Sequence, residues 1–123
     1  MGGGVLTNLG LGEAAKRAVG ISENQLPDMS SFASSLTDIG FYSLPGGLEM
    51  RWGYAVAHTV TTPVKFARPF KEKAFVVIPT KFTEDGRYVT PVNIQKDGFT
   101  LCGWQNAGGQ AQIDTYGYIA LGF

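Results

Sequence analysis

The sequence has little of the chemistry on which most catalytic and metal sites depend. Its 123 residues include one cysteine, Cys102, and one histidine, His58. A single cysteine excludes an internal disulfide and a multi-cysteine metal site, and its apolar neighbours favour a small buried hydrophobe over a reactive thiol. His58 could hold a metal only if several copies met on a symmetry axis, and an exposed loop histidine is the simpler interpretation. We therefore expect no metal and no cofactor.

The chain also lacks net charge and long apolar runs. Ten Lys and Arg residues balance ten Asp and Glu residues, and the basic ones are scattered. Surfaces for nucleic acids or anionic membranes need concentrated positive charge, so we expect neither partner. No apolar run reaches the ~18 residues of a membrane span, which argues against membrane insertion. The opening "MGGG" does not resemble a signal peptide, so we expect synthesis in the cytoplasm without one.

Turn-forming and aromatic residues are abundant, with 17 Gly, 6 Pro and 15 Phe, Tyr or Trp. This composition favours strands and turns over long helices, and the length suits one compact domain. We expect a mainly β protein with an antiparallel, sandwich-like domain over residues 48–123. Its strands are predicted at 48–56, 63–67, 73–80, 88–95, 98–104 and 115–122, and the residues "KDG" at 96–98 predict a hairpin turn between two of them.

Residues 1–47 have a different pattern and are predicted to form an elongated connector or stalk. They contain two possible short helices, over 12–19 and 29–36. Each is about two turns long, below the ~12–15 residues at which isolated helices become marginal. We therefore expect their apolar faces to be buried against copies of the same chain.

Two strands carry more apolar surface than one small sheet can cover. In "GGLEMRWGYAV" at 46–56, large apolar residues alternate with Glu49, Arg51 and small residues, so they share one face of a strand. The final "YGYIALGF" is apolar to the last residue, and we expect it inside the sheet and between subunits. The apolar middle of "KAFVVIPTKF" at 73–82 predicts a central strand.

If the strands run up and down, the loops 57–62, 81–87 and 105–114 meet at the end farthest from the stalk. Trp104 enters the longest of these loops, where it could stack on a sugar or pack as a core indole. Other polar and aromatic residues in and beside these loops could bind the hydroxyl groups of a receptor or merely form solvated loops and turns. These candidates are Gln105, Asn106, Gln110, Gln112, Asp114, Glu84, Asp85, Arg87, Tyr88 and His58.

The same residues argue against an enzyme. Glu84 and Asp85 are adjacent on a turn, whereas a glycosidase needs two carboxylates that face each other across a cleft. One histidine gives no clear Ser-His-Asp arrangement. We expect no catalytic residues.

The segments "LGLGEAAKRAVG", "NQLPDMSSF", "GFYSLPGGLEMRWGYA", "VKFARPFKEKAFVVIPT" and "YGYIALGF" together resemble the C-terminal tip domain of bacteriophage tail fibres and prophage side-fibre proteins. In that family a "LPxGL…WG" strand opens the domain and a "Y-I-A-x-G-aromatic" strand ends the polypeptide. Residues 1–4 have no counterpart and resemble an expression tag, which would make the chain a fragment of a longer fibre.

The resemblance implies a homotrimeric fibre end in the virion that recognises a bacterial surface structure during host attachment. Lipopolysaccharide or another envelope glycan is the commonest receptor, and an outer-membrane protein is the alternative. A second hypothesis is that the domain only trimerises and caps the fibre, with recognition elsewhere.

Overall fold

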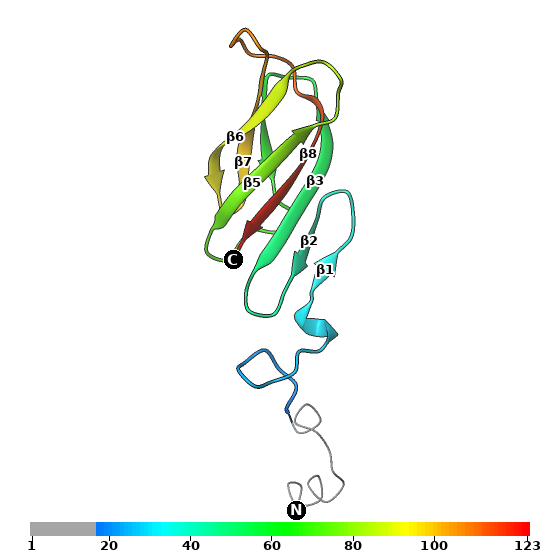
Figure 1. Cartoon of the computed structure of the whole chain (residues 1–123), viewed down its shortest axis with the longest axis vertical. Coiled ribbons are helices and arrows are strands. Elements are labelled where there is room, and N and C mark those ends of the chain that lie inside the picture. Colours follow the sequence, from blue (N-terminus) through cyan, green and yellow to red (C-terminus); the bar gives the residue numbers. More distant parts are fainter. Residues whose placement is uncertain (1–16) are drawn as a thin grey trace, which may run out of the picture.

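The computed structural model describes residues 17–123, which form two antiparallel sheets above an extended N-terminal segment (Figure 1). The first sheet has five strands in the order β1-β2-β3-β8-β5, and the second has three in the order β4-β7-β6. The strands are β1 (Ser34–Ser35), β2 (Gly40–Ser43), β3 (Glu49–Ala57), β4 (Thr61–Lys65), β5 (Ala74–Lys81), β6 (Tyr88–Gln95), β7 (Gly98–Trp104) and β8 (Asp114–Gly122).

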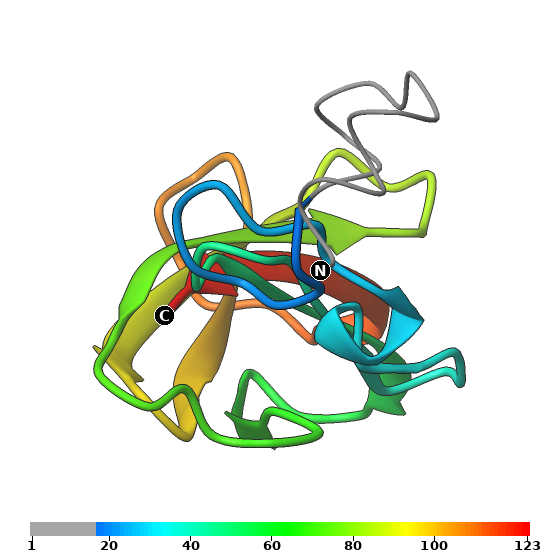
Figure 2. The same cartoon turned by 90° about the horizontal axis from the view of Figure 1, so that it is seen from below.

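The two sheets face each other, as the view from below shows (Figure 2). They enclose an aromatic core. Alternate residues of β8 supply Tyr116, Tyr118 and Ala120 to this core, because successive strand side chains point to opposite faces. Tyr118 packs edge-on against Phe99 of β7, with ring centroids 5.1 Å apart. Cys102 is buried and free, in agreement with its predicted role as a small hydrophobe.

The predicted mainly β, sandwich-like fold is confirmed, and all six predicted strands are present as β3 to β8. The "KDG" turn does join β6 to β7 as a hairpin. Its glycine is needed for space, because a Cβ on Gly98 would lie 2.1 Å from the carbonyl oxygen of Val64.

The prediction that the strand at 73–80, which is β5, lies at the centre of its sheet is wrong. β8 is central between β3 and β5, and β5 is an edge strand. The continuous apolar run in β5 suggested burial on both faces. In the structure Val77 enters the core, whereas Val76 and Ile78 face outward, because the outer face of this sheet is also apolar. Edge strands tolerate Pro79, which has no N–H to donate to a further neighbour.

The predicted small helices are not found among the described residues. The helix at 12–19 lies largely outside them, and residues 17–19 are not helical. The second is reduced to one 3₁₀ turn, η2 (Met29–Ser31), capped by Asp28. The chain then forms β1 and β2, which extend the large sheet beyond β3. The division into 1–47 and 48–123 stays a prediction, although β2 is hydrogen-bonded to the larger part.

The face of β3 that carries its large apolar residues points outward, and the face that carries Arg51 and small residues points into the core. Arg51, Gly53 and Ala55 face the interior, while Tyr54 and Val56 are about half exposed on the outside of the large sheet. The register continues this outer apolar face across the sheet. Its rows are Met50, Leu121 and Val76; Trp52, Ile119 and Ile78; and Tyr54, Gly117 and Thr80. We call these residues, with Phe82, the outer apolar face.

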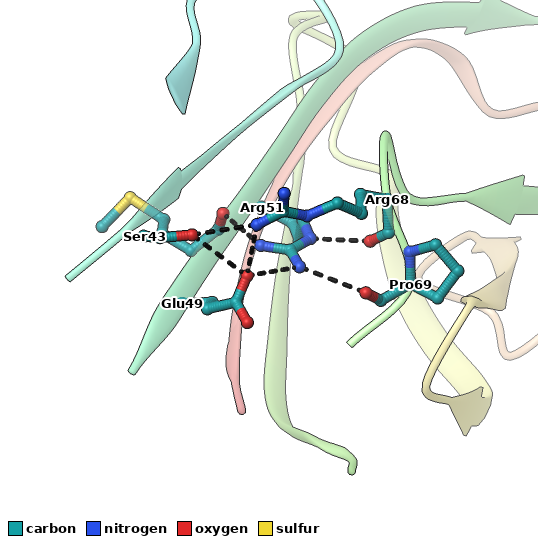
Figure 3. A network of polar contacts seen from close by, with 6 residues as sticks. Ser43, Glu49, Arg51, Arg68 and Pro69 are labelled. Atoms are coloured by element: carbon teal, nitrogen blue, oxygen red, sulfur yellow. Dashed lines mark hydrogen bonds and ion pairs between the residues drawn. The ribbon is translucent and has the colours of Figure 1, made fainter. Parts of the chain in front are cut away.

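A closed polar network fixes the end of the domain nearest the stalk (Figure 3). The fully buried Arg51 donates to the carbonyl oxygens of Arg68 (2.7 Å) and Pro69 (3.3 Å) and to Glu49 Oε1 (2.9 Å). Its guanidinium also lies over the ring of Phe70, 4.4 Å from the centroid. Arg68 donates to the same Glu49 oxygen at 3.0 Å. The network ties the 66–73 segment to β3.

This network predicts a loss of stability in acid. Partial burial disfavours the Glu49 carboxylate, but hydrogen bonds from Arg51 and Arg68 outweigh that cost and lower its pKa below 4.5. The carboxylate therefore contributes stability above about pH 4.5, and this contribution is lost as the pH falls through the folded-state pKa. We expect Glu49→Gln to lower the melting temperature at pH 7 and to approach the wild-type value as the pH falls through the folded-state pKa of Glu49. Melting curves across this range test it; the exposed Glu72→Gln is the control, and a pH-independent difference would contradict the assignment.

Candidate functional site

Three loops meet at the end of the sandwich opposite the stalk (Figure 1). They are residues 58–60 between β3 and β4, 82–87 between β5 and β6, and 105–113 between β7 and β8. The register places them together, since Ala57 pairs with Asp114 and Tyr88 pairs with Trp104. The predicted convergence of these loops at the far end is confirmed, although the strands alternate between two sheets.

Lys81 lies at the centre of this far end and joins two of the loops. Its side chain is only 4% exposed, and its Nζ donates to the carbonyl oxygen of Ile113 at 2.6 Å. The same Nζ lies 3.4 Å from Asp85 Oδ2 and 3.6 Å from Asp114 Oδ2. A buried cation is stable only when paired in this way. Lys81 therefore holds the 82–87 and 105–113 loops in one fixed arrangement.

The third loop is joined through Gln112. The side-chain amide nitrogen Nε2 of Gln112 lies 2.7 Å from Asp114 Oδ1 and 3.2 Å from His58 Nδ1. His58 is exposed, with its Nδ1 3.8 Å from Asp114 Oδ1. Asp114 has a φ of +59°, an uncommon conformation for a residue other than glycine, which these contacts help to hold. We call His58, Lys81, Asp85, Gln112 and Asp114 the far-end polar cluster.

Trp104 lies beside this cluster, not within it. Its ring is half-buried, and its indole N–H donates to Thr90 Oγ1 of β6 at 2.8 Å. That bond favours the packing of Trp104 as a core indole over stacking on a sugar, because the polar edge of the indole already has a partner within the protein. Beyond it, Gln105, Asn106 and Gln110 are exposed on a tight loop closed by backbone bonds between Gln105 and Gly108 or Gly109.

Glu84 and Asp85 were considered either as groups that bind hydroxyls or as turn residues, and the two residues differ in this respect. Asp85 accepts from the Arg87 backbone N–H at 3.1 Å and from Thr83 Oγ1 at 3.0 Å, as turn residues do. Glu84, Arg87 and Tyr88 are exposed around it. Of the eleven predicted site residues, four therefore belong to the far-end polar cluster and the other seven lie around it.

Lys81 was not among the predicted site residues. The alternation of β5 contained the signal, because Val77, Pro79 and Lys81 share one face and Val77 is in the core. A lysine at an inward-facing position at the end of a strand requires acidic or carbonyl partners, and such partners lie in the loops beside it.

The groups at the far end are suited to hydrogen bonding. Between residues 17 and 123 there is no group of three or more His, Cys, Asp or Glu side chains that could hold a metal ion. In the same part of the chain, no helix has the length and apolar character needed to cross a membrane. What the far end offers is amide, carboxylate, imidazole and guanidinium groups on a rigid base.

The described residues thus form a two-sheet antiparallel domain with loops gathered at one end and an extended segment at the other. The sequence of residues 43–123 matches the family described as tail fiber protein gp53-like, C-terminal. Because the match covers more than half of the chain, the protein belongs to this family of tail fibre domains. Tail fibres are parts of phage particles, so the chain is a virion-associated component.

Solved structures share the same fold. An N-truncated R1-type pyocin tail fiber is 18% identical with a TM-score of 0.62, and the alignment covers 100% of this chain and 97% of that one. An R2 pyocin fiber from P. aeruginosa is 15% identical with a TM-score of 0.63, and the alignment covers 100% of this chain but 29% of that one. No curated protein sequence matches the chain.

Proposed function

We propose that the chain forms the distal end of a homotrimeric tail fibre, where the far-end loops bind a glycan of the bacterial envelope during host attachment. The observation that carries the proposal is the far-end polar cluster, which joins two of the far-end loops through the buried Lys81 and the third through Gln112 and His58. Binding loops on a rigid scaffold are typical of recognition surfaces. The loops also lie opposite the stalk, where a fibre would first meet a cell.

The exposed side chains of these loops suit a glycan. Gln105, Asn106 and Gln110 offer amide groups that both donate to and accept from hydroxyl groups. Asp85 and Asp114 both contact Lys81, so the carboxylates at the centre of the site are used to position loops. The proposal includes no catalytic step.

The outer apolar face supports a homotrimer. Its members include Tyr54, Ile78, Phe82 and Ile119, all exposed in the single chain, and they lie side by side across three strands. Contiguous apolar patches of this kind mark interaction surfaces. Packing three copies through this face would remove it from water and would place three sets of far-end loops around one axis.

The alternative is a domain that only trimerises and caps the fibre. The outer apolar face also favours this function, because it accounts for assembly without any receptor. The two functions differ in what the far-end loops do, so variants in these loops distinguish them.

We expect the combined variant Gln105→Ala, Asn106→Ala and Gln110→Ala to abolish attachment to cells and lipopolysaccharide while the oligomer stays intact. Single sugar sites are weak, and three on one tip raise avidity by ~10²–10⁴, so losses at each site multiply. Fluorescent protein on a panel of Gram-negative strains, with purified lipopolysaccharide as competitor, measures this.

The near-end variant Lys71→Ala with Glu72→Ala is the matched control and should bind like the wild type. Equal attachment by the wild type and the far-end variant would instead favour the capping function. Attachment lost only in the near-end variant would place recognition at the opposite end of the domain.

A further inference from the structure

A polar hollow lies on the outer face of the small sheet, toward the end opposite the far-end loops. It measures about 270 Å³, and it is lined by residues of all three strands and of the turn between β6 and β7. The outer apolar face, through which the copies are proposed to pack, belongs to the other sheet. The polar side chains that line the hollow are those of Lys65, Asn93, Gln95, Asp97 and Thr100.

A bulge in β6 shapes this hollow. The pairing of β6 with β7 shifts between Val92 and Gln95, and Asn93 within the shift has a φ of +50°. Bulges redirect side chains and are frequent beside binding and catalytic sites. Across the sheet, Gly98 lies between Lys65 and Gln95 and has no side chain to fill the space between them.

The two amides of β6 form one wall of the hollow. Both side chains are exposed, and Gln95 Nε2 lies 3.3 Å from Asn93 Oδ1. This bond orients the two side chains relative to each other. It leaves the carbonyl oxygen of Gln95 as an acceptor and the amide N–H groups of Asn93 as donors, so the wall can bind a ligand that both donates and accepts.

Thr100 and Pro63 form the adjacent wall. They pair with each other across β7 and β4, and both face outward because their neighbours Phe99 and Val64 are buried in the core. The Thr100 hydroxyl can donate and accept a hydrogen bond. The exposed ring of Pro63 offers an apolar surface next to it.

The charges around the hollow cancel. Lys65 Nζ donates to Asp97 Oδ2 at 3.0 Å, and this hydrogen bond lowers the pKa of Asp97, so the carboxylate stays ionised and paired at neutral pH. The other polar groups of the lining are uncharged amides and a hydroxyl. A charged ligand would therefore find no unpaired countercharge in this lining, whereas a molecule with several hydroxyl groups matches the donors and acceptors present.

We propose that this hollow, which we call the flank hollow, is a second carbohydrate site that binds one neutral hexopyranose. The hydroxyl groups of the sugar would bind the Asn93 and Gln95 amides and the Thr100 hydroxyl, and its C–H face would lie on the Pro63 ring. Lys65 and Asp97 stay paired with each other and do not bind the sugar. The site does not depend on what the far-end loops bind.

The experiment is a titration of the isotope-labelled full chain, followed by NMR, with the methyl glycosides of glucose, galactose and mannose at millimolar concentrations. At least one of them should shift the side-chain amide signals of Asn93 and Gln95, whereas glucuronate and glucosamine, which are charged, should bind more weakly. Thr100→Val keeps the shape of the side chain but removes the hydroxyl. Asn93→Gly removes an amide and suits the positive φ. Each should weaken the affinity about three- to tenfold, the value of one hydrogen bond.

The matched control is Thr61→Val, which removes an exposed hydroxyl from the same face of the sheet but outside the hollow, and it should bind like the wild type. The far-end variant Gln105→Ala, Asn106→Ala and Gln110→Ala should also bind these sugars normally, which separates the flank hollow from the proposed receptor surface. Unchanged Asn93 and Gln95 signals with all three neutral sugars would overturn the proposal. So would wild-type affinity in both Thr100→Val and Asn93→Gly, an equal loss in Thr61→Val, or loss of binding in the far-end variant.

Discussion

Replacing Ile119 with lysine is expected to convert the proposed trimer into a folded monomer. Ile119 is at the centre of the outer apolar face, between Trp52 of β3 and Ile78 of β5. In the single chain its side chain is exposed, so a lysine there leaves the core intact. In the trimer the same lysine would put three unpaired charges into an apolar contact, at a cost of several kcal/mol each.

Sedimentation velocity at micromolar concentration measures the change, and circular dichroism checks that the β structure remains. The control is Val92→Lys, which introduces the same charge at an exposed apolar position of β6, in the other sheet. It should remain trimeric. Dissociation by both variants, or by Val92→Lys alone, would show that the subunit contact lies elsewhere.

Replacing Lys81 with methionine is expected to disorganise the far end. Methionine keeps most of the side-chain volume but removes the cation that pairs with Asp85 and Asp114 and donates to the Ile113 carbonyl. The two carboxylates, each partly exposed, then lose their partner beside a buried carbonyl. We expect a loss of about 2–3 kcal/mol in the free energy of unfolding.

If Lys81 positions the recognition loops, Lys81→Met should also weaken cell attachment by at least tenfold without changing the oligomer mass. Chemical denaturation and the cell-binding assay measure the two effects separately. The control Lys65→Met removes a lysine of the other sheet that is 72% exposed and forms a surface ion pair with Asp97. Such exposed pairs contribute little to stability, so this variant should resemble the wild type. Full stability in Lys81→Met would contradict the central position given to this lysine.

The sequence predicts the strands of this protein better than their arrangement. Turn residues such as the "KDG" at 96–98 mark the strand ends, and these marks are local, so β3 to β8 were found from the pattern alone. The place of a strand within its sheet depends on distant partners. β5 looked like a central strand because the outer face of its sheet is apolar as well as the inner one.

The helix predicted at 29–36 failed for a local reason. Ser30, Ser31, Ser34 and Ser35 fill the positions between its apolar residues, and serine side chains compete for backbone hydrogen bonds. Ser34 and Ser35 instead pair with Tyr42 and Phe41 in a short antiparallel ladder. This pairing is with residues later in the chain, outside the eight-residue segment 29–36 on which the helix prediction was based, so that segment alone does not reveal it.

The faces of β3 show the limit of periodicity most clearly. The alternation in 48–56 separates two faces correctly, but it does not say which face is inside. An inward Arg51 is acceptable only because the Arg68 and Pro69 carbonyls and the Glu49 carboxylate meet its guanidinium. Those partners lie up to 18 residues away along the chain. The same limit hid Lys81, whose inward position becomes evident only once the core residue Val77 is placed.

The mass of the unmodified chain in solution tests the proposed trimer most directly. Light scattering at micromolar concentration should give three times the 13.2 kDa of one chain, because the outer apolar face is covered only by neighbouring copies in this account. A mass of 13.2 kDa that persists at high concentration would contradict it, since the face would then stay exposed and the three sets of far-end loops would not share one surface.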